Sequence, residues 1–243
     1  SRKKGVVHTE IFLPVYAPTE YKNRQTLWNA VEKAEKNKKA QLAYSFDIAL
    51  QDELSTEENI ALARRFVQEC LVSKGMIADL VVHLPDKGGG GISNPHFHVM
   101  TTMRPLNPDG TWGNKQRREY VLDENGERKK DENGSYIFTT IHTTDWNETE
   151  TLEHWREAWC RMVNDEFERK DLVVRIDHRS YEAQGIEQIP TVHEGPLVQK
   201  MEKRGIRTQK GDLNRWIKAS NRLLAGLKKK IHSLLDWIAS IKK

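Results

Sequence analysis

The stretch that decides the fold reads Asp79-Leu-Val-Val-His83-Leu-Pro85, then a glycine-rich bend, then Asn94-Pro-His96-Phe-His98-Val-Met100. Side chains on a strand alternate between the two faces of a sheet, so His96 and His98 should point the same way. The glycines suit a reversal between two strands, and pairing of the two runs would bring His83 beside the other histidines. Three imidazoles on one sheet face can hold a divalent metal with coordination positions left open, which indicates a catalytic rather than a structural site.

The spacing alone leaves two interpretations open. The three histidines can form a metal site, or they can be ordinary core or surface residues of strands, since His-x-His pairs also arise by chance. A metal site would itself name no reaction, because metal-dependent hydrolases, non-haem iron oxygenases and nucleases all use histidine ligands.

The composition bounds the class of protein. The 243 residues, 30% charged and 37% hydrophobic, suit one large domain or a domain with an appendage. No apolar run approaches the roughly 18–20 residues that span a membrane. Cys70 and Cys160 fall in predicted helices, which favours reduced packing residues and a cytoplasmic protein. The chain opens at Ser1 directly before an apparent strand, so we expect further residues upstream in the native protein.

Charge is distributed unevenly along the chain. Residues 200–243 hold 13 Lys and Arg against 3 Asp and Glu, a net of +10, and residues 1–199 hold 26 against 32, a net of −6. A basic tail attracts nucleic acid through phosphate contacts. The alternative is an ordinary solvated helix face.

Hydrophobic periodicity and turn residues place strands at 5–13, 41–50, 77–84, 96–103 and 136–142. Helices are expected at 26–38, from the Ser55–Glu58 capping box to Gly75, and at 148–169. Residues 107–135 are polar and contain Asp-Glu-Asn-Gly twice, which indicates a surface β-excursion. This order predicts an α+β fold, a mainly antiparallel central sheet with helices on one face.

The C-terminal segment predicts one long helix, about 48 Å at 1.5 Å per residue. Asp212 can cap its start. Together with Ser220, the apolar positions follow steps of three and four, at Ile217, Leu224, Leu227, Ile231, Leu234, Ile238 and Ile241. Such a stripe can pack on its own domain, begin a coiled coil, or lead into further sequence.

Ordered blocks across the chain resemble the MobA/MobL plasmid mobilisation relaxases. The blocks are Arg2-Lys-Lys-Gly-Val-Val-His8-Thr-Glu10-Ile, Asn94-Pro-His96-Phe-His98-Val-Met-Thr-Thr-Met-Arg104, Arg175-Ile-Asp177-His178-Arg179-Ser180-Tyr181-Glu-Ala-Gln-Gly185, Pro190–Pro196 and Met201–Arg215. They span nearly the whole chain and are far more specific than a lone His-x-His.

The resemblance implies an enzyme that nicks one DNA strand at a plasmid transfer origin. A tyrosine attacks the scissile phosphate and stays joined to the 5′ end, so the strand can later be rejoined. The implied fold is that of the HUH endonucleases. Residues 1–199 would be the relaxase core, N-terminally truncated, and 200–243 a basic helical segment. The implied partners are single-stranded or hairpin origin DNA and accessory mobilisation proteins in the bacterial cytoplasm, with no membrane segment.

The resemblance also assigns roles to residues. His83, His96 and His98 would hold a divalent ion, Mg²⁺, Mn²⁺ or similar, which would neutralise charge on the phosphate. Catalytic acids or bases are expected at Asp47 and Glu10. The remaining expectation is that Asp79 and His8 orient the ligands by hydrogen bonds. The alternative for Glu10 and Asp79 is ordinary surface charge.

Four cations are expected to contact DNA: Arg179, Arg207, Lys210 and Arg215. Arg179 suits a phosphate fork, and the basic segment suits single-stranded DNA. For the Asp177–Tyr181 block and His193, a structural hydrogen-bond network is the alternative.

Two departures from the family pattern matter. The family's nucleophile lies in an Ala-Tyr-Arg-Ser-like segment before the first block, and none of the chain's six tyrosines matches it. Relatives often carry Glu-x-Glu where this chain has Ser45-Phe-Asp47, so Asp47 can keep an acidic role with a shorter reach and Ser45 cannot. We therefore expect this chain alone to be unable to form the covalent bond. A DNA-binding remnant without cleavage and an unrelated His-x-His metal hydrolase are the alternatives.

Overall fold

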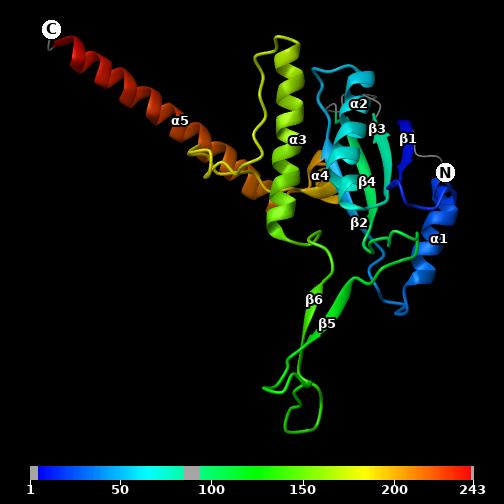
Figure 1. Ribbon diagram of the computed structural model, residues 1–243. Coiled ribbons are helices and arrows are strands. Elements are labelled where there is room, and N and C mark those ends of the chain that lie inside the picture. The colour runs from blue at the N-terminus through cyan, green and yellow to red at the C-terminus, as the bar shows by residue number, and fades with distance from the viewer. Residues whose placement is uncertain (1–4, 85–93, 242–243) are drawn as a thin grey trace. The chain divides into compact units, whose positions relative to one another are not determined.

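The structure is a computed structural model that describes residues 5–84 and 94–241 (Figure 1). The chain divides into two compact units, Ser1–Asp177 and His178–Lys243. The boundary expected at residues 199/200 rests on the change of net charge along the sequence, and it lies inside the second unit. No helix in the described part of the chain is both long and apolar enough to cross a lipid bilayer.

The first unit is built on a four-stranded antiparallel sheet. Its strands are β1 (Val6–Phe12), β2 (Ala43–Ala49), β3 (Ala78–His83) and β4 (His96–Thr102). They lie in the order β1-β3-β4-β2, and every neighbouring pair is antiparallel. The predicted α+β class and the predicted pairing of the two histidine runs are therefore confirmed.

Two helices, α2 (Thr56–Phe66) and α3 (Thr149–Arg169), cover one face of this sheet. The fully buried side chains of that face, among them Leu80, Phe97 and Val99, form the main core with the apolar stripes of both helices. Apolar burial of this kind is the main stabilising contribution to a fold. Short helical turns at Thr19–Lys22, Val67–Leu71 and Val72–Lys74 (η1, η2 and η3) complete the described helical segments of this unit.

The helix α1 (Arg24–Ala34) departs from the expectation that the helices share one face. Its buried residues Leu27 and Val31 pack with Ile77 in a second core cluster. Ile77 precedes β3 by one residue and alternates with Ala78, so α1 lies on the face opposite α2 and α3. The helix ends at Ala34, earlier than predicted, because Glu35 turns inward to pair with Arg104.

A two-stranded ribbon, β5 (Gln116–Tyr120) and β6 (Phe138–His142), confirms the surface β-excursion. Between the strands, Asp123 and Asp131 each accept two backbone N–H groups at 2.9 Å, so the repeated motif forms the same turn twice. The strand predicted at 136–142 belongs to this ribbon rather than to the central sheet.

The second unit contains α4 (Gly195–Lys203) and α5 (Gln209–Ile241). The predicted long C-terminal helix is confirmed, but the prediction that Asp212 caps its start is wrong. The helix begins at Gln209, and the Thr208 hydroxyl accepts the Gly211 N–H at 3.1 Å. Asp212 lies in the first turn, where it pairs with Arg207 and Arg215.

The predicted capping box at the start of α2 is present, and it is tied to α3. The Ser55 hydroxyl accepts the Glu58 N–H at 3.2 Å, and the Glu58 carboxylate accepts the Ser55 N–H at 2.7 Å. Lys170 also donates to this carboxylate at 2.8 Å. Together Lys170 and Ser55 lower the pKa of Glu58 from 4.5 to about 2. A lowered folded-state pKa stabilises the fold above 4.5, and that contribution is lost as the pH falls towards 2.

We predict that Glu58→Gln lowers the free energy of unfolding at neutral pH, and that the difference from the parent chain shrinks as the pH falls from 4.5 towards 2. Urea unfolding at a series of pH values measures this. Glu57→Gln is the matched control, because Glu57 lies in the same first turn and is exposed. The same pH dependence for both variants would contradict the role given to Glu58.

Candidate metal centre

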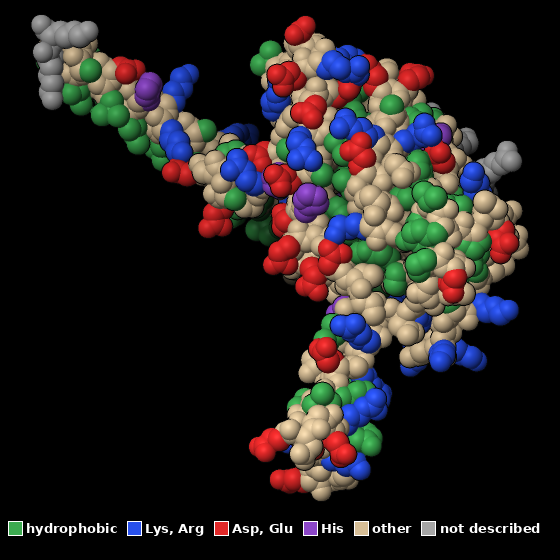
Figure 2. All heavy atoms as spheres, in the orientation of Figure 1, with side chains coloured by type: hydrophobic (Ala, Val, Ile, Leu, Met, Phe, Trp, Pro, Cys, Tyr) green, Lys and Arg blue, Asp and Glu red, His purple; other side chains and the backbone are tan. Residues whose placement is uncertain are grey.

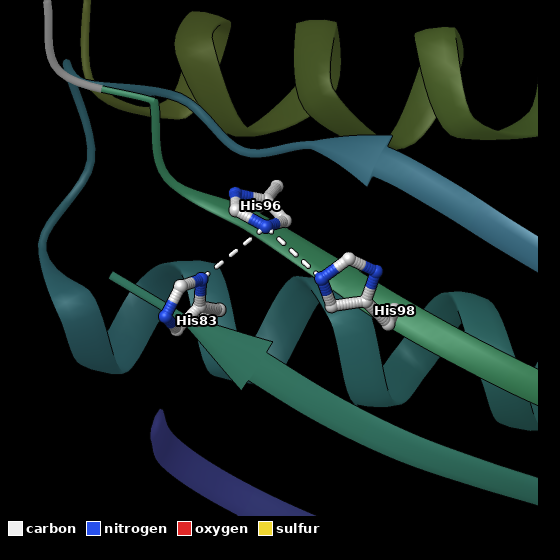
Figure 3. Close-up of side chains that lie close together, drawn as sticks. All are labelled: His83, His96 and His98. Atoms are coloured by element: carbon white, nitrogen blue, oxygen red, sulfur yellow. Dashed lines mark hydrogen bonds between the residues drawn. The ribbon is translucent and has the colours of Figure 1, made fainter. Parts of the chain in front are cut away.

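The three histidines meet at one end of the β3–β4 pair. His83 and His96 are direct partners across the two strands, and His98 follows two residues later on the same face. His96 Nε2 lies 3.3 Å from His83 Nδ1 and 3.0 Å from His98 Nε2 (Figure 3). The candidate ligand nitrogens all lie within 4.8 Å of one another, and all three side chains are half-buried.

These distances fit a shared metal ion. An imidazole nitrogen binds such an ion at about 2.1 Å. Tetrahedral or octahedral angles then place neighbouring ligand nitrogens about 3.0–3.4 Å apart. The separations of 3.3 and 3.0 Å agree with this requirement for two of the three pairs, and the third pair, His83 with His98, lies within 4.8 Å. Three neutral nitrogen ligands on one side leave the remaining coordination positions for a substrate or water.

Hydrogen bonds select the nitrogen that two of the ligands present. His96 Nδ1 lies 2.7 Å from the Asn94 carbonyl oxygen, which can only accept, so this nitrogen carries the proton. His98 Nδ1 bonds to the Asp47 carboxylate in the same way. In each neutral ring the Nε2 lone pair is then directed at the cluster. This is the arrangement by which outer partners fix histidine ligands.

Asp47 reaches His98 because the two residues are direct partners across β2 and β4. Directly opposed residues have Cβ atoms about 4.5–5.5 Å apart, so a short aspartate side chain suffices. The structure therefore places Asp47 where its carboxylate fixes the His98 imidazole.

Glu10 and His8 do not reach the histidine cluster. Glu10 is the partner of Leu80, a core residue, so it shares the face that carries α2. There the Glu10 carboxylate binds Arg64 at 2.7 and 3.1 Å and His8 at 3.1 Å. Burial opposes ionisation, but these bonds outweigh it and lower the pKa of Glu10.

A β-bulge is the physical reason for this correction. The β1–β3 register shifts between Val6 and His8, so His8 pairs with Val82. Without the shift, His8 would pair with Val81, on the histidine face. One extra residue exchanges the two faces for everything that follows it.

Asp79 lies on the histidine face but is engaged elsewhere. It is 5% exposed, and its carboxylate accepts two bonds from Arg24 at 2.7 and 2.6 Å. The Trp28 indole donates a third at 3.0 Å. Both partners belong to α1, so Asp79 fastens α1 to the sheet. The expectation that Asp79 orients a histidine ligand is therefore wrong.

The sheet face around the histidines is accessible. Thr9, Ser45 and Met100 are exposed there, and Asp47 has 72% of its side chain exposed. Within the described residues, α1 covers only the end of this face that holds Ile77 and Asp79. Among the described residues, the part of the face that carries the histidines is therefore open to solvent.

The predicted DNA-contacting cations belong to the second unit, and most take part in its internal bonding. Arg215 pairs with Glu202 and Asp212, and Arg207 with Asp212. The bond from Arg215 is the main reason that the pKa of Glu202 falls to about 2. The Lys210 ammonium lies 3.2 Å from the His193 carbonyl oxygen.

The backbone carbonyl of Arg179 accepts the Gln184 side-chain N–H at 2.7 Å. The other three predicted cations, Arg207, Lys210 and Arg215, bond to residues in or next to α4 and α5. Arg207 still keeps 74% of its side chain exposed.

The sequence reasoning missed a group of cations and aromatic rings on the β5–β6 ribbon. The Arg118 guanidinium lies 4.4 Å from the Phe138 ring centroid, and the Arg128 guanidinium 4.0 Å from that of Tyr120. In the sequence, this group is indicated by Arg, Tyr and Phe residues that alternate around the two Asp-Glu-Asn-Gly motifs. Lys and Arg side chains line the ribbon, with acidic side chains at its end (Figure 2).

Comparison with known proteins identifies the family. The family model described as MobA/MobL family matches residues 1–204. The chain belongs to the MobA/MobL family. This membership agrees with the ordered sequence blocks and with the antiparallel sheet that carries the histidine cluster.

Relatives extend over most of the chain. It is 36% identical over 224 residues to "Conjugal transfer protein TraA" of Agrobacterium fabrum, an alignment that covers 86% of this chain and 19% of the relative. It is 32% identical over 255 residues to "Probable mobilization protein MobA" of Bifidobacterium longum, covering 99% and 44%. The chain thus spans less than half the length of these two relatives.

A solved structure described as "Molecular Basis of Vancomycin Resistance Transfer in Staphylococcus aureus" is similar in fold. The TM-score is 0.58 at 30% sequence identity, and the match covers 73% of this chain and 78% of the other.

We predict that Asp47→Ala weakens divalent-ion binding by about 10- to 100-fold, because His98 loses the bond that fixes its ring. Glu10→Gln, on the opposite face, should leave the affinity unchanged. Titration of Mn²⁺ into each folded variant, followed by calorimetry, measures both. Equal Mn²⁺ affinities for Asp47→Ala and the parent chain would contradict the role predicted for Asp47.

Proposed function

We propose that this chain contributes the metal-binding core of a DNA relaxase, which nicks one strand at a plasmid transfer origin and transfers it to a tyrosine. The observation that carries the proposal is the histidine cluster, with hydrogen-bonded ligand rings on an accessible sheet face, in a chain of the MobA/MobL family.

The cluster suits phosphodiester transfer. A divalent ion held by His83, His96 and His98 would neutralise the charge that develops on the non-bridging phosphate oxygens. Neutral imidazoles add no negative charge of their own, so the positive charge of the ion stays available to the substrate. Imidazole ligands suit first-row transition ions better than Mg²⁺, which prefers oxygen ligands. Asp47 would hold His98 in position throughout.

The nucleophile would be a tyrosine from the segment that the family places before the first block. Its phenolic oxygen forms a bond to phosphorus, the bond from phosphorus to the 3′ oxygen breaks, and that oxygen leaves as a 3′-hydroxyl after gaining a proton. The reverse reaction rejoins the strand.

The tyrosines of the first unit are committed elsewhere. Tyr21 stacks on Trp112, Tyr44 packs against the main core, and Tyr120 and Tyr136 lie on the ribbon. The Tyr16 hydroxyl lies beside Gly75. These positions support a nucleophile supplied from outside the described residues of the first unit.

The substrate would be single-stranded or hairpin origin DNA in the bacterial cytoplasm, with accessory mobilisation proteins as further partners. The net charge of +10 on residues 200–243 supports a sequence-independent attraction to phosphates. The cations and aromatic rings of the β5–β6 ribbon offer a second surface for nucleic acid.

We predict that this chain alone gives no covalent adduct with origin DNA. The same chain extended by the family's upstream tyrosine segment should give a 5′-phosphotyrosyl adduct with Mn²⁺. An origin oligonucleotide labelled at its 3′ end keeps the label on the downstream strand, so the protein-joined band on a denaturing gel measures the adduct. In the extended chain, replacement of that tyrosine by Phe is the control and should abolish it.

Three results would contradict the proposal. Covalent cleavage by the 243-residue chain itself would refute the external nucleophile. Origin binding without nicking by the extended chain would favour a DNA-binding remnant. Hydrolysis of small phosphate or carboxylate esters in the absence of DNA would favour an unrelated metal hydrolase.

A further inference from the structure

The second half of α5 carries a continuous apolar stripe that the described residues leave exposed. Its large hydrophobic side chains are between 43% and 66% exposed, and they are Leu223, Leu227, Ile231, Leu234, Leu235, Trp237, Ile238 and Ile241. Hydrophobic side chains line this helix in Figure 2. Single exposed hydrophobics are ordinary, but a contiguous stripe marks an interaction site.

The spacing of the stripe indicates what covers it. From Leu224 the positions advance by three and four residues to Ile241, a repeat of seven. An α-helix has 3.6 residues per turn, so a strict repeat of seven keeps the stripe facing another helix wound around it. The spacing therefore predicts a helical partner rather than a globular groove.

The residue types indicate how many helices join a parallel coiled coil. Ile231 and Ile238 occupy the first core position of their heptads, and Leu227 and Leu234 occupy the second. β-branched residues at the first position with leucine at the second favour two parallel strands. The four central core positions therefore match a parallel two-stranded coiled coil.

The flanking positions are compatible with a second copy of the same helix. In a parallel pair, Leu223 of one copy faces Lys228 of the other, and Lys230 faces Leu235. No two like charges meet at these pairs, and each lysine can lay its apolar stem along a leucine. The Lys228 ammonium lies 2.6 Å from the Glu187 carboxylate of its own unit, and both side chains are largely exposed.

The first half of α5 is held within its own unit, which leaves the second half available. Ile217 is buried, and the Asn214 side chain bonds to both the N–H and the carbonyl of Val192 at 2.8 and 2.9 Å. The Asn221 side chain bonds to Ile189 in the same way, at 3.0 and 2.8 Å. The change from buried to exposed falls close to Leu224, where the central heptads begin.

We propose that residues 223–241 of α5 pair with the same segment of a second copy in a parallel two-stranded coiled coil. The seam would hold two catalytic units together, independently of whether they nick DNA. Arg222 and Lys229 lie at the heptad position farthest from the seam, so the pairing leaves their charges outward for a polyanion.

Sedimentation equilibrium of the 243-residue chain tests the pairing. We expect a mass approaching twice 28.2 kDa as the concentration rises. The double variant Ile231→Asp/Leu234→Asp should stay monomeric, because two charges would be buried in the seam. Lys229→Asp, outside the seam, should dimerise like the parent. Circular dichroism of each variant checks that α5 remains helical.

Cysteine cross-linking tests the direction. Under oxidising conditions Leu227→Cys should give a covalent dimer and Lys229→Cys should not, since only a parallel seam brings two copies of residue 227 together. A parent chain that stays monomeric at every concentration overturns the proposal. So does equal cross-linking of both variants. If the parent instead binds phosphatidylglycerol vesicles and Ile231→Asp/Leu234→Asp does not, the stripe is a membrane-surface helix and the proposal fails.

Discussion

The antiparallel pairing of β3 with β4, in one register, is the constraint on which the candidate site depends. His83 lies opposite His96, and the period of two brings His98 to the same face. A slip of one residue would send one strand's histidines into the core and leave the other's outside. The register is fixed from the opposite face, where Leu80, Val82, Phe97 and Val99 are fully buried against α2 and α3. The hydrophobic core therefore positions the polar cluster without touching it.

The pattern of the strands was predictable because it is local. Alternation and a glycine-rich bend predicted the antiparallel pairing of β3 with β4, although the bend itself lies outside the described residues. Heptad spacing predicted α5. The bulge in β1 was not predictable, because nothing in Val-Val-His-Thr-Glu announces an extra residue. That bulge moved Glu10 and His8 to the far face. The predicted face of Asp79 was correct. Alternation along a strand does not indicate the hydrogen-bond partner of a carboxylate, however, and the Asp79 carboxylate accepts from Arg24 and Trp28. The bond between Asp47 and His98 follows from a cross-strand register that only the structure supplies.

The two faces of the central sheet differ in how far helices cover them. One face is closed by helices and supplies stability. Among the described residues, α1 covers the other face at the end remote from the histidines, where the ion pair between buried Asp79 and half-exposed Arg24 fastens it. An ion pair with one buried partner is expensive to break, since it would leave a buried charge alone. It therefore suits a fixed boundary between the covered and the accessible parts of that face.

The central claim is that the three histidines together hold one divalent ion. Metal analysis of the chain after equilibration with Mn²⁺ and removal of free ion tests it most directly, with His96→Ala/His98→Ala as the comparison. The account predicts one bound ion per parent chain, none in the double variant, and the same circular dichroism spectrum for both, because neither imidazole belongs to the core. An unchanged metal content in the folded double variant would contradict the account.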